Sequence, residues 1–414
     1  MNIEDNAEEA AFRAEVRAFL EANAVRRSGA ALGYETEDDT VKVPAAKRWQ
    51  AIKARAGFAG ITWPKSAGGR GGKPIEEVIF RQEEKQYAVP RGVFEIAMNV
   101  CIPAILDHGT PEQHARHVAA ALRGDEIWCQ LFSEPGAGSD LAGLRTQARR
   151  DGDDWIIDGQ KTWTSSGHYA DFGLLIARTD PTVPKHEGMT TFILDMRTPG
   201  VEVRPIRQMS GTVHSGFNDV FFSGVRISDS QRVGAPGKGW KVTVSALNHE
   251  RYGLAESPVM QPGAEDLFRL ACEVVDSRGK PLIDDPAVRE RLADLMVRAR
   301  GVKYTGYRTL TALSEGRPLG PESSIVKLVL GAMSQDISMV GIDLLGLGGM
   351  VMNPDIAPMG AWFQNAMLAT PPGRIAGGTD EVLRNIVAER ILGLPEDMRA
   401  DKNVPFNQIR TGSR

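Results

Sequence analysis

The chain has 414 residues, of which 42% are hydrophobic and 25% charged, with a formal net charge of −4. This length allows two or three domains with ample cores, and the mild negative charge argues against a nucleic-acid partner. The three cysteines are widely separated and form neither a metal-ligand spacing nor a disulfide framework, so we expect a reducing, cytoplasmic compartment.

Two kinds of targeting segment are not expected. The N-terminal residues are acidic and lack the apolar core of a signal peptide. The most apolar region, residues 337–352, is interrupted by Asp343 and several glycines, so we expect no membrane span.

The first predicted domain, residues 1–125, is helical. Apolar residues recur at helical spacing from Phe12 to Leu20. A loop rich in glycine and proline, residues 63–74, then separates two helical blocks, and the second block begins at Pro74.

The length and spacing of the apolar segments change twice after this domain. Residues 126–238 consist of short apolar segments between Gly, Asp and Pro turns, which predicts a β domain of barrel or sandwich type. Residues 239–400 return to long amphipathic helices and predict a four-helix bundle. The final residues, 401–414, are expected to be a loosely ordered tail. The predicted fold class is therefore α+β, with several domains.

The most informative stretch runs from Gln130 to Ser166. It opens with Gln-Leu-Phe-Ser-Glu-Pro-Gly-Ala-Gly-Ser-Asp, a strand leading into a turn whose small residues let backbone amides approach a ligand. A predicted hairpin follows and ends at Trp163, an aromatic residue flanked by hydroxyls. Each motif alone is weak, because a strand tryptophan is more often core and a Gly-rich run can be any tight turn.

Together with the helical, β, helical order, these motifs resemble the acyl-CoA dehydrogenases over nearly the whole chain, residues 12–394. The resemblance implies a fold in which the three domains enclose FAD. It places Phe132 and Ser133 at the flavin pyrimidine ring, Trp163 on the flavin face opposite the substrate, and Ser165 at N5. The other cofactor-binding residues that we expect are Gln130, Gly138, Ser139 near the pyrophosphate and the CoA arm, Thr379 and Glu381.

The resemblance also implies the reaction, α,β-dehydrogenation of an acyl-CoA thioester to the trans-2-enoyl-CoA. The β hydrogen leaves as hydride to flavin N5, while a carboxylate takes the α proton and hydrogen bonds polarise the thioester oxygen. The implied electron acceptor is an electron-transferring flavoprotein.

The carboxylate is not where most relatives have it. In many relatives it is the Glu of a Glu-Gly-Thr turn, but here that position is Gly377, which can offer only its backbone amide to the thioester oxygen. A minority, including isovaleryl- and long-chain-type enzymes, place the Glu earlier, just before an Arg. Glu250, followed by Arg251, matches that pattern. A solvated helix charge is the alternative for Glu250, and the loss at Gly377 favours the base.

The surface that would serve a neighbouring subunit's flavin departs from the family pattern. Val275 occupies the position of the Arg that binds the pyrophosphate in relatives, and Arg278 occupies the position of the Phe that follows it. Asp343 replaces a residue that is usually Gln, and its anionic side chain would repel phosphate. Either Arg278 substitutes in a homotetramer, or the chain is the catalytic half of an α2β2 heterotetramer, as in bacterial enzymes for steroid side chains.

Three rival functions remain at the level of sequence. The chain could be a same-fold flavoenzyme with other chemistry, such as a desulfinase or monooxygenase, against which Glu250 argues. It could be a non-catalytic partner subunit, an alternative that the changes at Val275 and Asp343 leave open. A nucleic-acid-associated relative is disfavoured by the net charge.

Overall fold

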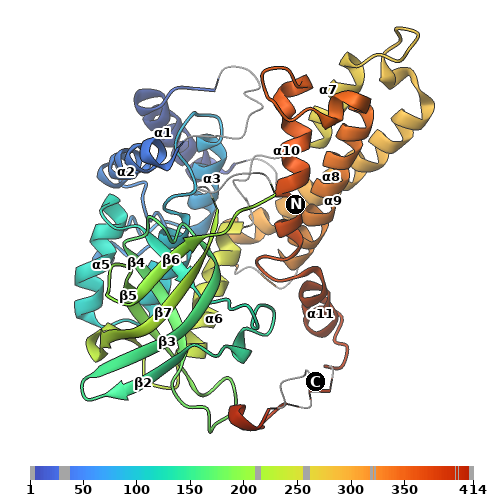
Figure 1. The fold of residues 1–414 in the computed structure, drawn as a ribbon. Helices are drawn as coiled ribbons and strands as arrows, with labels where there is room; N and C mark the ends of the chain where they lie inside the picture. Colours follow the sequence, from blue (N-terminus) through green and yellow to red (C-terminus); the bar gives the residue numbers. More distant parts are fainter. Residues whose placement is uncertain are drawn as a thin grey trace. The chain divides into compact units, whose positions relative to one another are not determined.

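The computed structural model describes residues 5–27, 38–209, 216–254, 262–317, 320, 323–396, 398–399 and 401–409. Its chain contacts divide it into two compact units (Figure 1). The first, called here the bundle unit, combines Met1–Glu37, Val78–Ala88 and Leu254–Pro395. The second, the sheet unit, combines Asp38–Glu77, Val89–Gly253 and Glu396–Arg414. Each unit combines segments from distant parts of the chain, so this division does not test the three predicted domain boundaries, which remain a prediction.

The sheet unit is built on eight strands in the order β6-β7-β3-β2-β4-β5-β8, with β1 pairing in parallel with β4 (Figure 1). Strands β4 and β5 are almost wholly buried, as expected for apolar runs at the centre of a sheet. The strands are β1 (Trp128–Leu131), β2 (Gln147–Asp151), β3 (Asp154–Ser165), β4 (Phe172–Arg178), β5 (Met189–Asp195), β6 (Val201–Pro205), β7 (Phe217–Ser228) and β8 (Arg232–Val233).

The longest ladder joins β3 to β7 in antiparallel register, and two irregularities interrupt it. At the first, Gly159 has φ +148°, and a Cβ there would lie 2.6 Å from the Thr146 hydroxyl, so only glycine fits. The second falls between Lys161 and Thr164 and reshapes the end of β3.

Four helices accompany the sheet in this unit: α2 (Asp39–Arg55), α4 (Ile102–His108), α5 (Pro111–Arg123) and α6 (Gly239–Leu254). Helix α5 has strong local signals, since Thr110 and Gln113 form a capping box and Gly124 ends it at φ 79°. A π-helical turn, Ala97–Cys101, precedes α4, and its buried residues Ala97, Val100 and Cys101 share a hydrophobic core with Trp128 of β1.

The bundle unit contains α1 (Ala7–Asn23), α7 (Ala264–Glu273), α8 (Pro286–Ser314), α9 (Ser323–Leu345), α10 (Trp362–Ala369) and α11 (Asp380–Arg390). Its core gathers Leu267, Leu292, Ile337 and Phe363 from four of these helices. Helix α3 (Pro74–Glu84) begins in the sheet unit and ends in the bundle unit.

The predicted fold class is confirmed: helices, then a central sheet, then helices. Two details differ from expectation. Residues 401–409 are not a loose tail but pair with the sheet unit through a bridge between Pro405 and Pro184. The helical stretch Ser324–Met350 is long and apolar enough to cross a membrane by length and composition, and only 28% of its most apolar window is buried within the chain. Core helices pass the same test, and Ile337 and Val340 of α9 lie in the bundle core.

Candidate active site

The two motifs singled out in the sequence are joined by a buried ion pair. Lys161 of β3 is fully buried, and its Nζ donates to Glu134 Oε1 at 2.8 Å and to the Phe132 carbonyl at 2.9 Å. The amide of Thr162 donates to the Ser133 carbonyl at 2.9 Å. The segment 132–134 is therefore fixed against the end of β3 by side-chain and backbone bonds together.

Glu134 is well supplied with donors. Besides Lys161, it accepts from the backbone amides of Arg145 at 2.6 Å and Thr146 at 2.9 Å. Burial works against its charge, but Lys161 and these amides outweigh burial and lower the pKa of Glu134. Burial also lowers the pKa of Lys161, to about 8, against the attraction of Glu134.

Trp163 lies at the second irregularity of β3 and points out of the core. Its φ is 58°, in the left-handed region, and the residue is 58% exposed. Its ring meets Phe217 edge to face at a centroid distance of 5.6 Å. Such a backbone costs on the order of 1–3 kcal/mol for a bulky residue and persists only where its surroundings impose it. Trp163 is therefore not a core residue. The chain presents its exposed aromatic ring at a strained backbone position.

The other candidate residues of this stretch lie on either side of the Lys161–Glu134 pair and Trp163 in the sequence. Ser165 is the last residue of β3, opposite Phe217, and is half-buried. Gln130 in β1 and Ser133 just after β1 are also half-buried. Gly138 and Ser139 are exposed in the Gly-rich turn, which begins with a short bridge between Glu134 and Ala137. The structure thus brings the candidate flavin-ring residues together on one unit, through contacts that span about thirty residues of sequence.

Glu250 lies near the end of α6 and is partly buried in the same unit. Burial and Cys129 raise the pKa of the buried Cys101 thiol, and the nearby charge of Glu250 adds to that rise. Helix α6 is tied to the end of α4 by Asp107, which accepts from Ser245 Oγ at 2.5 Å and pairs with His249 Nε2 at 2.8 Å. Arg251 continues α6, and its side chain lies outside the described part of the structure.

Gly377, Thr379 and Glu381 belong to the bundle unit. Gly377 has φ 64° and Gly378 φ 96°, so a glutamate in this turn would sit in a strained backbone. The Thr379 hydroxyl accepts from the Val382 amide and caps α11, while Glu381 lies exposed in its first turn.

Comparison with known proteins identifies the family. Models of the acyl-CoA dehydrogenase N-terminal, middle and C-terminal domains match residues 6–125, 129–225 and 237–392. The chain belongs to the acyl-CoA dehydrogenase family. It is thus a member of an oxidoreductase family of flavoproteins.

Two relatives from Mycobacterium tuberculosis are similar to this family member. Acyl-CoA dehydrogenase FadE34 is 38% identical over 86% of this chain, but the chain spans only 47% of that protein's length. Acyl-CoA dehydrogenase IpdE1 is 34% identical over 94% of this chain and 98% of its own.

Two solved structures share its fold. The Tcur3481–Tcur3483 steroid ACAD superposes with a TM-score of 0.77 at 29% identity, over 96% of this chain and 100% of that one. The ChsE4–ChsE5 complex from Mycobacterium tuberculosis gives the same TM-score at 27% identity, with the same coverage.

In this acyl-CoA dehydrogenase the surface expected to serve a neighbour's flavin is already engaged within its own chain. Arg278 donates to Asp276 of the same turn through Nε at 2.9 Å and Nη2 at 2.7 Å. Asp343 pairs with Arg291 at 3.0 Å, and Val275 is an exposed apolar residue. The hypothesis that Arg278 substitutes for the missing arginine thus requires breaking its bond to Asp276.

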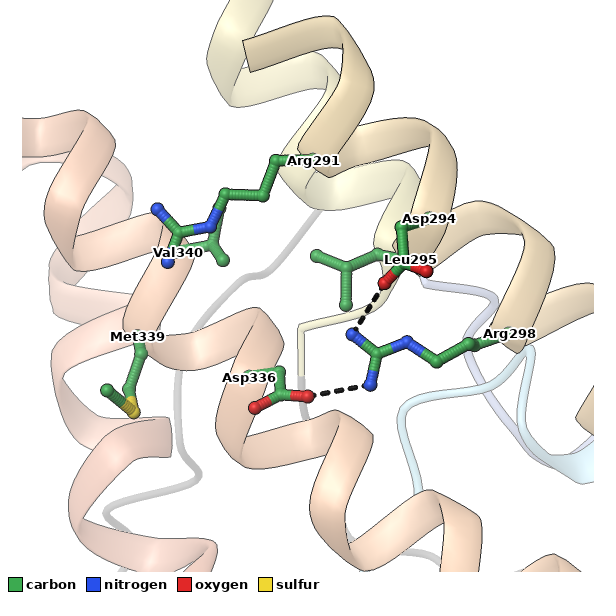
Figure 2. Close-up of a pocket in the computed structure, with 7 residues that line it drawn as sticks. All are labelled: Arg291, Asp294, Leu295, Arg298, Asp336, Met339 and Val340. Atoms are coloured by element: carbon green, nitrogen blue, oxygen red, sulfur yellow. Dashed lines mark hydrogen bonds and ion pairs between the residues drawn. The ribbon is translucent and has the colours of Figure 1, made fainter. Parts of the chain in front are cut away.

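A pocket of about 260 Å³ lies beside Arg291 between α8 and α9 (Figure 2). Figure 2 shows Arg298 bridging Asp294 and Asp336, at 2.9 Å and 2.7 Å, so its charge is neutralised on both sides. The pocket is lined by Arg291, Asp294, Leu295, Arg298, Asp336, Met339 and Val340. Its charges balance, and nothing in it singles out an anionic ligand.

Sequence reasoning named Phe132, Ser133 and Trp163 but missed what positions them. Glu134 and Lys161 both lie in the stretch from Gln130 to Ser166, but their sequence neighbours are largely polar or small, so no pattern in the sequence marks them as a buried ion pair. Asp107, which ties down α6, carries no signal either, because an aspartate at a helix end is commonplace.

Proposed function

We propose that the chain is an FAD-dependent acyl-CoA dehydrogenase that converts an acyl-CoA thioester to its trans-2-enoyl-CoA. The observation that carries this proposal is the exposed, left-handed Trp163, held beside the Phe132–Ser133 segment by the Lys161–Glu134 pair. A strained aromatic platform with hydroxyls on either side fits a flat, polar-edged ring system. When bound, FAD would accept the β hydrogen of the substrate as hydride.

The chain's own residues would hold the cofactor. Phe132 and Ser133 would contact the pyrimidine ring, Trp163 would pack on the flavin face, and the Ser165 hydroxyl would bind N5. The exposed residues Gly138 and Ser139 suit a pyrophosphate, because an open glycine turn lets backbone donors reach an anion. Gln130, Thr379 and Glu381 complete the proposed cofactor contacts.

Glu250 is the proposed base that takes the α proton. Its support is that it lies partly buried on a helix tied down at Asp107, and that the other candidate position is a left-handed glycine, Gly377. In this proposal the amide of Gly377 polarises the thioester oxygen, and Arg251 accompanies the base.

The substitution Glu250→Gln tests the proposed base. In the assembly that holds FAD, we expect FAD content to be unchanged and dye-coupled dehydrogenation to fall by at least about a hundredfold, since general-base removal typically costs that much. Glu273→Gln, an exposed glutamate at the end of α7, is the matched control. Activity of Glu250→Gln within tenfold of wild type contradicts the assignment.

We further propose that the chain is the catalytic half of an α2β2 heterotetramer. Support comes from Val275, from Asp343 with its partner Arg291, and from Arg278 bound to Asp276. Solved structures similar to this chain include the two-chain ChsE4–ChsE5 complex. The chain purified alone should hold little FAD, and co-expression with a second dehydrogenase-like chain should restore it. Stoichiometric FAD in a homotetramer of this chain would refute the heteromer.

The family and the relatives also support a proposed class of substrate and a proposed electron acceptor. A steroid-derived acyl-CoA is the first substrate to test, because a similar structure is described as a steroid ACAD. Reduction of an electron-transferring flavoprotein should accompany turnover. A panel of acyl-CoA thioesters of increasing bulk, assayed with that acceptor, separates a steroid-type from a short-chain preference.

A further inference from the structure

The C-terminal residues 401–409, called here the strap, pack on the sheet unit (Figure 1). The amide of Phe406 donates to the Val183 carbonyl and that of Asn407 to the Pro181 carbonyl, both at 2.9 Å. Pro405 pairs with Pro184. The strap therefore adds backbone bonds to the loop between β4 and β5, although about 220 residues of sequence separate them.

Arg178 connects the strap to the residues that directly follow the Gly-rich turn. It is 3% exposed, and the face of the Phe406 ring lies 3.8 Å from its guanidinium carbon. Its Nη2 donates to the Ala142 carbonyl at 2.6 Å, just beyond the turn, and its Nη1 to the Lys185 carbonyl at 2.7 Å. Burial lowers the pKa of Arg178 to about 10. The Phe406 ring thus covers a buried cation, a contact that is strongest where water is excluded.

Lys185 makes the second connection. Its Nζ lies 2.9 Å from both carboxylate oxygens of Asp140, the last residue of the turn motif, and 2.5 Å from Asp401 of the strap. The Lys185 side chain is only 13% exposed. Burial acts against its charge, but the hydrogen bonds to Asp401 and Asp140 outweigh it and raise the pKa of Lys185. Two cations therefore join the strap to both ends of residues 140–142.

We propose that the strap is a positioning element for the Gly-rich turn, residues 136–140, and prepares its backbone amides for the diphosphate of the cofactor. This inference rests on the proposed function. Within the turn, Ala137 is buried and pairs with Glu134, but nothing lies within 4 Å of a Cβ position at Gly136 or Gly138, so packing around these two glycines does little to fix them. A turn ordered before binding loses less conformational entropy when the ligand arrives, and its affinity rises accordingly. Phe406 and Asp401 act through Arg178 and Lys185, not by touching the ligand.

The test substitutes Phe406 in the full-length chain, purified in the assembly it forms in its host. Phe406→Ala should raise amide hydrogen exchange in residues 136–144 and raise the Kd for FAD, measured by reconstituting the apoprotein, about tenfold. Phe406→Tyr should restore both values, because it keeps the aromatic face over Arg178. Asn407→Ala is the matched control, since its side chain is exposed and the strap uses only its backbone amide. Asp401→Asn offers a milder second variant if Phe406→Ala does not fold, with an expected threefold rise in Kd.

The outcomes separate the two proposals. Unchanged exchange in residues 136–144, or raised exchange with an unchanged Kd for FAD, overturns the positioning role and leaves the proposed function intact. A wild-type assembly with no affinity for FAD overturns the proposed function and this inference with it. Equal losses in Phe406→Ala and Asn407→Ala would show a general effect of the tail and also refute the specific role of Phe406.

Discussion

Lys161 and Glu134 form an ion pair at 2.8 Å that joins the two halves of the candidate flavin-ring site. The lysine is fully buried and the Glu134 side chain is 8% exposed. Both charges are satisfied by further bonds, to the Phe132 carbonyl on one side and to two backbone amides on the other. The pair therefore fixes geometry more than it adds stability, since a buried ion pair roughly offsets its own desolvation.

Removing one partner should be costly. Glu134→Gln leaves the Lys161 ammonium buried without its counter-charge and should lower the free energy of unfolding by about 3–5 kcal/mol. The double substitution Glu134→Gln with Lys161→Met removes the unpaired charge and should recover at least half of that loss. Urea denaturation of the two variants and wild type measures both values. A double variant as unstable as the single one would show that the charge is not the cause.

The same pair predicts behaviour in acid. The folded pKa of Glu134 lies below its usual value of 4.5, so its stabilisation is fully present above about pH 4.5. It is lost as the pH falls through the lower folded pKa. The difference in unfolding free energy between wild type and Glu134→Gln should therefore shrink between pH 5 and pH 3. A difference that is constant over this range would mean that the carboxylate charge is not what stabilises the fold.

Trp163 should separate stability from cofactor binding. Trp163→Gly removes the strain of φ 58° but loses the Phe217 contact, so the unfolding free energy should stay within about 1 kcal/mol of wild type. FAD affinity should fall at least about tenfold, because the aromatic platform is gone. The contrasting substitution is Trp155→Ala on the same strand, at a buried residue, which should cost about 3–5 kcal/mol. Unaltered FAD binding in Trp163→Gly would remove the tryptophan from the site.

Asp107 should affect turnover more than stability. Its pKa is lowered by the hydrogen bond from His249, and both side chains are more than a third exposed, so the pair contributes less than about 1 kcal/mol. Asp107→Asn should nevertheless lower kcat about tenfold with FAD affinity unchanged, since small displacements of a base are expensive. Glu202→Gln disrupts another surface ion pair, with Arg204, and should change neither quantity. An unaltered kcat in Asp107→Asn would mean that this tether does not position Glu250.

The local part of this structure was predictable from the sequence. Periodicity located the helical and β regions, and the turn residues around Gly138 and the aromatic Trp163 marked the candidate site. The Lys161–Glu134 pair was not predicted, because it depends on the register between the segment after β1 and the far end of β3. The strap was missed for a similar reason: residues 401–409 mix polar and apolar side chains with no periodicity, and they are held by contacts with Arg178 and Lys185.

The exposed face of the bundle unit gives the last prediction. Val275 and Asp343 stand where the family pattern expects an arginine and a glutamine, and Asp343 holds Arg291 at 3.0 Å. The double substitution Val275→Arg with Asp343→Gln adds a cation, removes an anion and releases Arg291 from its ion pair. The local charge becomes more positive by two, which favours the binding of a phosphate. If this surface serves a flavin in a neighbouring copy, FAD retained by the chain expressed alone should rise severalfold, as measured by absorbance after gel filtration. Val297→Arg adds a cation at an exposed apolar position of α8 and should not raise the amount of FAD retained. No gain in the double variant would mean that the shortage of pyrophosphate contacts is not what limits FAD binding by this chain.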